Sequence, residues 1–61
     1  MRSDIRDRGG KLIGYTQDSG HRVEARDPGG RLLGYYDSLS NVTRDPGGKL
    51  IAKGNMLSHF F

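Results

Sequence analysis

The chain contains three versions of the decapeptide Arg26-Asp27-Pro28-Gly29-Gly30-Arg31-Leu32-Leu33-Gly34-Tyr35. The other two versions begin at Arg6 and Arg44, so the copies are spaced 20 and then 18 residues apart. Repetition at this period indicates one small structural unit that is used three times. The architecture is therefore set by the structure that a single copy encodes.

Each copy predicts a β-hairpin. In Asp27-Pro28-Gly29-Gly30 the aspartate suits the first position of a turn, proline fixes φ at the second, and both glycines tolerate positive φ. Two turns fit this order: a type I turn followed by a left-handed glycine that forms a bulge, or a type II turn that uses the first glycine. The first copy has Arg8 in place of proline, which loosens the turn without changing its type.

The segments around the turns read as strands. Aliphatic and tyrosine side chains between turn residues favour strand over helix. The sequence predicts six strands, at about residues 3–7, 11–17, 21–27, 31–37, 41–45 and 49–54. We therefore expect an all-β fold in one domain, residues 1–61, in which three pseudo-symmetric antiparallel hairpins form a six-strand meander. The hairpins cover about residues 3–17, 21–37 and 41–54.

Alternation along the second strand of each hairpin predicts which side chains share a face. It places Leu12, Leu32 and Leu50 on one face with Gly14, Gly34 and Ala52, and it places Ile13, Leu33 and Ile51 on the other with Tyr15, Tyr35 and Lys53. Two interpretations of the recurring small residue remain open. It permits close approach of another backbone, or it allows the strand to curve or bulge.

The C-terminal tail, residues 55–61, differs from the repeats. Asn55 is a suitable helix N-cap, and the four large apolar residues of the tail fall on one helical face: Met56, Leu57, Phe60 and Phe61. We expect a short helix or an apolar arm. So short a helix is not stable alone and must dock, either on its own sheet or on a neighbouring molecule.

Size and topology both favour self-association. A chain of 61 residues without cysteine has a marginal core, and an open sheet leaves two edges that invite further pairing. We therefore expect a homo-oligomer. The residues predicted to form its interface are Tyr35, Tyr36, Met56, Leu57, Phe60 and Phe61.

Cations flank each turn, and the chain carries a net charge of +3. If the turns gather at one end, these cations form a basic surface, with nearby tyrosines as stacking partners for single-stranded nucleic acid. The competing interpretation is cross-strand pairing with carboxylates and charge protection of edge strands. The predicted nucleic-acid contacts are Arg6, Arg8, Lys11, Arg26, Arg31, Arg44 and Lys49.

Residues for catalysis are sparse. His21 and His59 have no histidine, cysteine or carboxylate partners at metal-site spacing, and the repeated aspartates are explained by the turns. We expect no enzyme activity, no cofactor and no metal. No apolar leader follows Met1 and no run has transmembrane length, so the expected location is cytoplasmic, without membrane association.

The motif Asp-x-Gly-Gly-(Lys/Arg)-Leu-(Ile/Leu)-Gly, with Tyr35-Tyr36-Asp37 and Gly54-Asn55-Met56-Leu57, resembles small bacterial β-hairpin-repeat proteins of the four-fold beta flower kind. The resemblance covers about residues 4–58 and implies hairpin petals around a pseudo-symmetry axis, with no established activity. This chain has three copies, so a fourth petal is missing, is contributed by a partner or is replaced by the tail. Tyr36-Asp37 and residues 41–48 are also similar to the YD repeats of bacterial toxin shells.

Together these features predict a non-enzymatic structural or interaction module that works as a homo-oligomer, with a further protein partner left open. The alternative prediction is a weak, non-specific nucleic-acid-binding protein that uses the basic hairpin ends.

Overall fold

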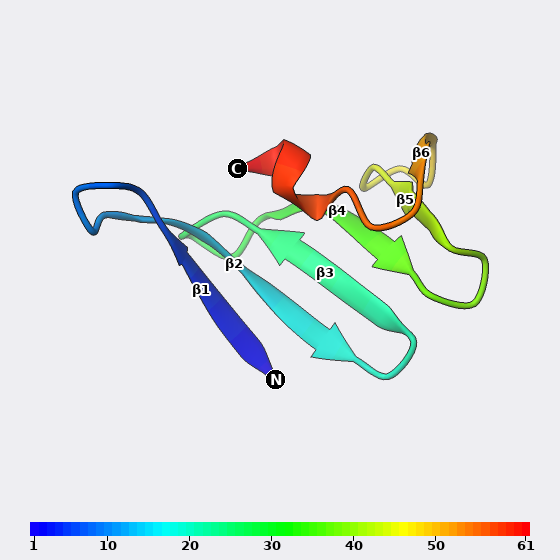
Figure 1. The fold of residues 1–61 in the computed structure, drawn as a ribbon, viewed down its shortest axis with the longest axis horizontal. Helices are drawn as coiled ribbons and strands as arrows, with labels where there is room; N and C mark the ends of the chain where they lie inside the picture. The colour runs from blue at the N-terminus through cyan, green and yellow to red at the C-terminus, as the bar shows by residue number, and fades with distance from the viewer.

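A computed structural model describes residues 1–61 and contains one antiparallel sheet whose six strands follow chain order (Figure 1). The predicted all-β meander of three hairpins is confirmed. The strands are β1 (Arg2–Arg6), β2 (Leu12–Ser19), β3 (Arg22–Arg26), β4 (Leu32–Asp37), β5 (Val42–Arg44) and β6 (Leu50–Lys53). One 3₁₀ helix, η1 (Leu57–Phe60), follows the last strand.

All three hairpins share two turn hydrogen bonds, from the residue after the second glycine to the aspartate carboxylate and from the second glycine to the aspartate carbonyl. In the first, the Asp7 carboxylate accepts the N–H groups of Gly9 and Lys11, both at 2.9 Å, and the Gly10 N–H donates to the Asp7 carbonyl at 3.0 Å. Gly10, Gly30 and Gly48 have φ of 87°, 93° and 91°, whereas the glycine before each does not have positive φ. The turn is therefore the type I form with a left-handed glycine, and the type II alternative is wrong.

A β-bulge follows each turn and changes the faces of the second strand. Arg6 lies opposite Leu12 but Ile5 lies opposite Gly14, so Ile13 is the extra residue. Neighbours on β1 point to opposite faces, which places Leu12 and Gly14 on opposite faces as well. The register shifts in the same way at Leu33 and Ile51. The predicted shared face of the leucines and the small residues is wrong, because simple alternation takes no account of the extra residue.

Gly14 and Gly34 permit close approach of both backbone and aromatic rings. A Cβ built on Gly14 would lie 2.6 Å from the Arg26 carbonyl oxygen and would overlap the Phe61 ring. A Cβ on Gly34 would lie 2.8 Å from the Arg44 carbonyl oxygen and would overlap the Phe60 ring. Of the two interpretations of the small residue, close approach holds at this position, and the bulge lies one residue earlier.

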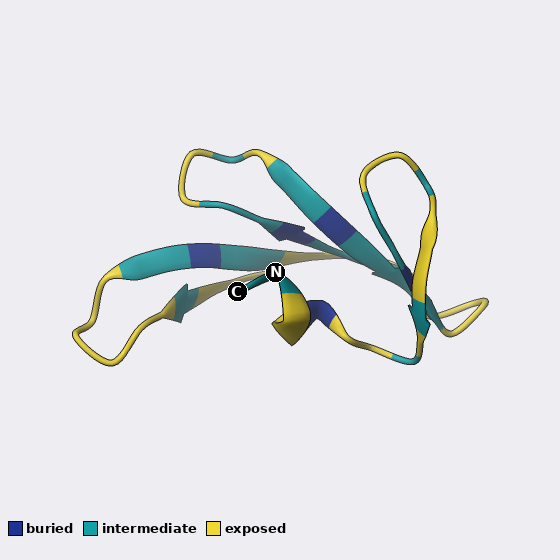
Figure 2. Cartoon of the chain, turned by 90° about the horizontal axis from the view of Figure 1, so that it is seen from above, coloured by how far each residue is buried: buried dark blue, intermediate teal, exposed yellow.

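The tail crosses its own sheet rather than leaving it. Thr43 Oγ1 donates to the Gly54 carbonyl at 2.7 Å and accepts the Met56 N–H at 3.0 Å, which fixes the chain as it turns back. The helix η1 then packs against β4. Figures 1 and 2 show this segment lying over one face of the sheet. Docking in cis is the alternative that the structure adopts.

The tail is shorter and tighter than the predicted helix. Asn55 Oδ1 accepts the Leu57 N–H at 3.2 Å, but only four residues form the helix, and they are of the 3₁₀ type. With three residues per turn, Leu57 and Phe60 share a side. Met56 is 46% exposed, whereas Leu57 is 5% exposed. The expectation of one four-residue apolar face is therefore wrong for Met56.

The closed core is thin. Five residues are buried, namely Gly14, Ala25, Gly34, Thr43 and Leu57, and they lie in the middle of β2 to β5 and at the start of η1 (Figure 2). Two of them are glycines and one is threonine, so little apolar side chain is enclosed. Every close contact in this layer consequently carries a large share of the stability.

We expect Gly34→Ala to lower the free energy of unfolding by at least about 2 kcal/mol, because the added methyl group overlaps the Phe60 ring and the Arg44 carbonyl. Urea unfolding followed by circular dichroism measures the change. Gly9→Ala is the matched control, because its Cβ would meet only the Asp7 carboxylate at 3.5 Å. Equal effects of the two substitutions would show that Gly34 is not a packing position.

Candidate functional site

The sheet has two open edges, β1 and β6, and of these two strands only β6 contains exposed large apolar residues, since Ile5 of β1 is partly buried. Leu50 is 50% exposed and Ile51 is 40% exposed. The equivalent pairs in the other hairpins, Leu12 with Ile13 and Leu32 with Leu33, are only partly exposed. The following strand pairs with β2 from Tyr15 onward and with β4 from Tyr35 onward, beyond these pairs, whereas no strand follows β6. We call Leu50 and Ile51 the β6 apolar pair.

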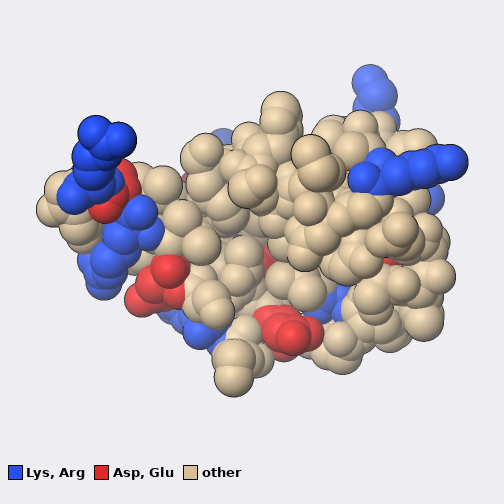
Figure 3. All heavy atoms as spheres, viewed as in Figure 1, with Lys and Arg blue, Asp and Glu red and all other residues tan.

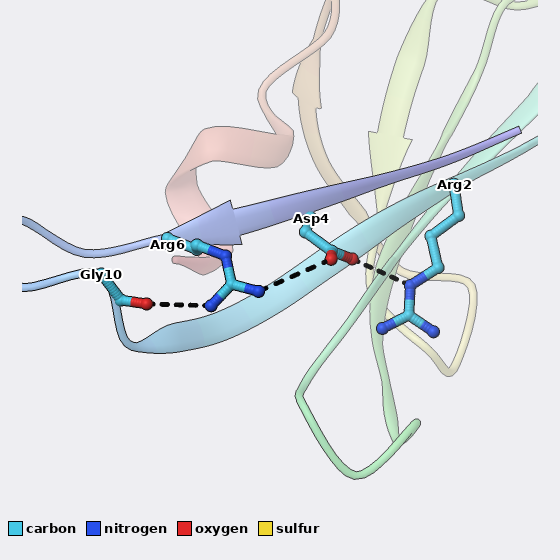
Figure 4. Close-up of polar contacts among 4 residues, drawn as sticks. All are labelled: Arg2, Asp4, Arg6 and Gly10. Atoms are coloured by element: carbon cyan, nitrogen blue, oxygen red, sulfur yellow. Dashed lines mark hydrogen bonds and ion pairs between the residues drawn. The ribbon is translucent and has the colours of Figure 1, made fainter.

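The edge at β1 has a different chemistry. Arg2 Nε donates to Asp4 Oδ1 at 2.9 Å, and Arg6 lies 4.0 Å from the same carboxylate (Figure 4). All three side chains are substantially exposed, so each pair contributes only about 0–1 kcal/mol. Their larger effect is to place alternating charges along an edge strand, which discourages pairing with other chains.

The same pattern recurs in the second hairpin. Glu24 lies 3.7 Å from Arg22 and 3.0 Å from Arg26. In the first two hairpins an arginine also stacks on a tyrosine: Arg2 lies 3.8 Å from the centre of the Tyr15 ring, and Arg22 lies 3.8 Å from that of Tyr35. The sequence-based prediction missed this cluster. The spacing Arg-x-(Asp/Glu)-x-Arg, which places three charges on one strand face, is the signal that identifies it.

The structure places the predicted interface residues in different environments. Leu57, Phe60 and Phe61 pack on their own sheet, and Met56 is exposed. Tyr35 lies beneath Arg22, and the Tyr36 hydroxyl donates to Asn41 Oδ1 at 2.8 Å. The tail therefore contributes to the core of one molecule. The β6 apolar pair, which was not among the predicted interface residues, is the exposed apolar edge.

The predicted nucleic-acid contacts also fall into two groups, namely arginines that bind their own turn and cations that form no ion pair. Arg6, Arg26 and Arg44 each donate a hydrogen bond to the carbonyl of the left-handed glycine in their own turn, at 2.9, 2.7 and 2.8 Å. These bonds give the three arginines a role in fixing the turns. The other predicted contacts form no ion pair, and they are Arg8, Lys11, Arg31 and Lys49.

The turns that carry these cations do not come together. Figure 2 shows three hairpin turns that fan out in different directions. On the face drawn in Figure 3, the most prominent lysine and arginine side chains lie at the left end and at the upper right, and a few charged atoms lie along the lower margin between them. The arrangement gives separate basic tips rather than one basic surface.

Groups with chemical reactivity lie apart from one another. His21 is in the turn between β2 and β3, and His59 is in η1, where its ring lies edge-on to Phe60 at a centroid distance of 5.9 Å. The structure has no pocket and no group of three residues of the metal-ligating types. No helix has the length and apolar character needed to cross a membrane.

Comparison of the chain with protein-family models, curated proteins and solved structures gives no match. The resemblances to beta flower proteins and to YD repeats thus stay predictions. The contacts and the exposed surfaces of the chain itself are the grounds for a functional proposal.

We expect Leu57→Ala to lower the free energy of unfolding by about 2–3 kcal/mol, because the side chain is buried in its own sheet. Thermal unfolding over a wide range of protein concentration measures the loss of stability and shows whether that loss depends on concentration. Met56→Ala, at the exposed neighbouring position, should be close to neutral. A loss that disappears at high protein concentration would show instead that the tail docks on a neighbouring molecule.

Proposed function

We propose that this protein is a non-enzymatic structural or interaction module that works as a homo-oligomer. The single observation that carries the proposal is the exposure of the β6 apolar pair at an open sheet edge. Two further copies of the same pair exist in the chain, Leu12 with Ile13 and Leu32 with Leu33, and both are partly buried. The other two hairpins thus give an internal comparison, in which only the β6 pair is exposed.

The amount of exposed apolar surface supports association rather than isolation. Leu50 and Ile51 lie next to each other on an edge strand that has free backbone N–H and C=O groups. An exposed apolar edge strand is a template for pairing with another chain. The thin core adds a second reason, because burial of this pair would stabilise a sheet that encloses few apolar side chains.

We expect the wild-type chain to have a mass above that of a 6.8 kDa monomer, and Leu50→Ser/Ile51→Thr to shift it toward the monomer. Light scattering on a sizing column, at several loading concentrations, measures this. Threonine keeps the strand propensity at the second position. Leu39→Ser is the matched control, because Leu39 is 77% exposed in the turn between β4 and β5 and is not part of β6. A monomeric wild type at every concentration would disprove the proposal.

The second candidate is weak nucleic-acid binding, and the cations without ion-pair partners at the turn tips support it. Because the tips fan out, we expect no affinity for single- or double-stranded oligonucleotides tighter than about 100 µM at low salt, the range of non-specific binders. Fluorescence anisotropy with labelled oligonucleotides tests this. Tighter binding that weakens steeply with salt, and that is lost in Arg31→Ala but kept in Arg26→Lys, would favour this candidate.

A further inference from the structure

Adjacent hairpins dock on one another in a repeated manner. Tyr15 of β2 lies opposite Arg26 of β3, and Tyr35 of β4 lies opposite Arg44 of β5. At the preceding residue, Gly14 or Gly34, the carbonyl of that same arginine occupies the space where a Cβ would be. The receiving strand therefore needs glycine at the first of these two positions, and in both cases it has tyrosine, an uncharged residue, opposite the arginine.

The third hairpin departs from both features. Ala52 stands where the other hairpins have glycine, and Lys53 stands where they have tyrosine. The strand β6 then ends at Lys53, whereas β2 and β4 continue past the equivalent tyrosine. Gly54 has φ of 79° and its carbonyl accepts a hydrogen bond from Thr43, so the chain bends away from the edge.

These changes act directly against a second copy of the chain. The strand β1 is equivalent to β3 and β5, with Arg6 in the place of Arg26 and Arg44. If β1 of a second copy docked on β6 as β3 docks on β2, the Arg6 carbonyl would lie within about 2.6–2.8 Å of the Ala52 Cβ, as the built atoms on Gly14 and Gly34 indicate. That separation is well inside the normal contact distance of about 3.5 Å. The Arg6 side chain would also face Lys53, and like charges directly opposite are destabilising.

We infer that β6 is closed to β1 of a second copy, so that the homo-oligomer is a closed two-fold pair built on the β6 apolar pair. The inference rests on the proposed function for the existence of the pair. Head-to-tail docking of β1 on β6 is heterologous and would extend without limit unless it closed into a ring. A two-fold contact instead brings each β6 apolar pair against its own copy and leaves the charged β1 edges outside.

The experiment restores the docking features at β6. Ala52→Gly/Lys53→Tyr recreates the Gly-Tyr sequence of β2 and β4, and the mass is measured by light scattering from about 10 µM to about 1 mM. We expect a two-copy mass for the wild type, with no larger species at high concentration, and a mass that rises continuously with concentration for the variant. Ala52→Gly/Lys49→Tyr is the matched control with the same change in composition, and we expect it to keep the wild-type mass because Lys53 still faces Arg6. Amide NMR spectra of each variant verify that it is folded.

The outcomes separate this inference from the proposed function. A two-copy mass for both the wild type and the folded Gly-Tyr variant would overturn the inference and leave the homo-oligomer standing. A wild-type mass that increases without limit would also overturn it, since β6 would then already be open. If the wild type is monomeric and the Gly-Tyr variant associates, the two-copy oligomer is rejected but the closure of β6 is supported. If both proteins are monomeric, the two-copy oligomer and the closure of β6 are both rejected.

Discussion

The absence of a side chain at Gly14 and Gly34 is the constraint on which the rest of the structure depends. At each glycine a carbonyl of the next hairpin approaches from one direction and a phenylalanine ring of the tail covers the same position. These contacts join hairpin to hairpin and tail to sheet in one place. Because the positions are occupied by backbone and rings, the sheet can bury its centre with few large side chains. The thin core is the consequence of this arrangement.

The turns make that arrangement possible by fixing each hairpin locally. The aspartate carboxylate, the left-handed glycine and the arginine that binds the glycine carbonyl recur in all three copies. Arg8 in place of proline leaves the turn type unchanged, and this turn has one further hydrogen bond, from the Gly9 N–H to the Asp7 carboxylate. Local chemistry therefore sets each bulge, and each bulge orients the strand that carries the critical glycine.

The parts of the fold that depend on local chemistry were predictable from the sequence. The three turns and the six strands follow from Asp-x-Gly-Gly and the residues after it. The faces of Leu12 and Gly14 did not follow, because a bulge adds one residue to the strand without changing its composition. The path of the tail did not follow either, since apolar spacing predicts that Leu57 is buried but does not say in which molecule. The β6 apolar pair became visible only when its exposure was compared with that of its two equivalents.

The tail has a consequence for the cooperativity of folding. Strands of a meander contact mainly their sequence neighbours, so a three-hairpin array behaves as a linear chain of units that open from the ends. Phe61 touches the position of Gly14 in the first hairpin, and Phe60 touches that of Gly34 in the second. These two rings connect units that are distant along the chain. Opening of the first or the second hairpin would therefore remove a contact of the tail, and we expect this coupling to make the hairpins unfold in a single all-or-none transition.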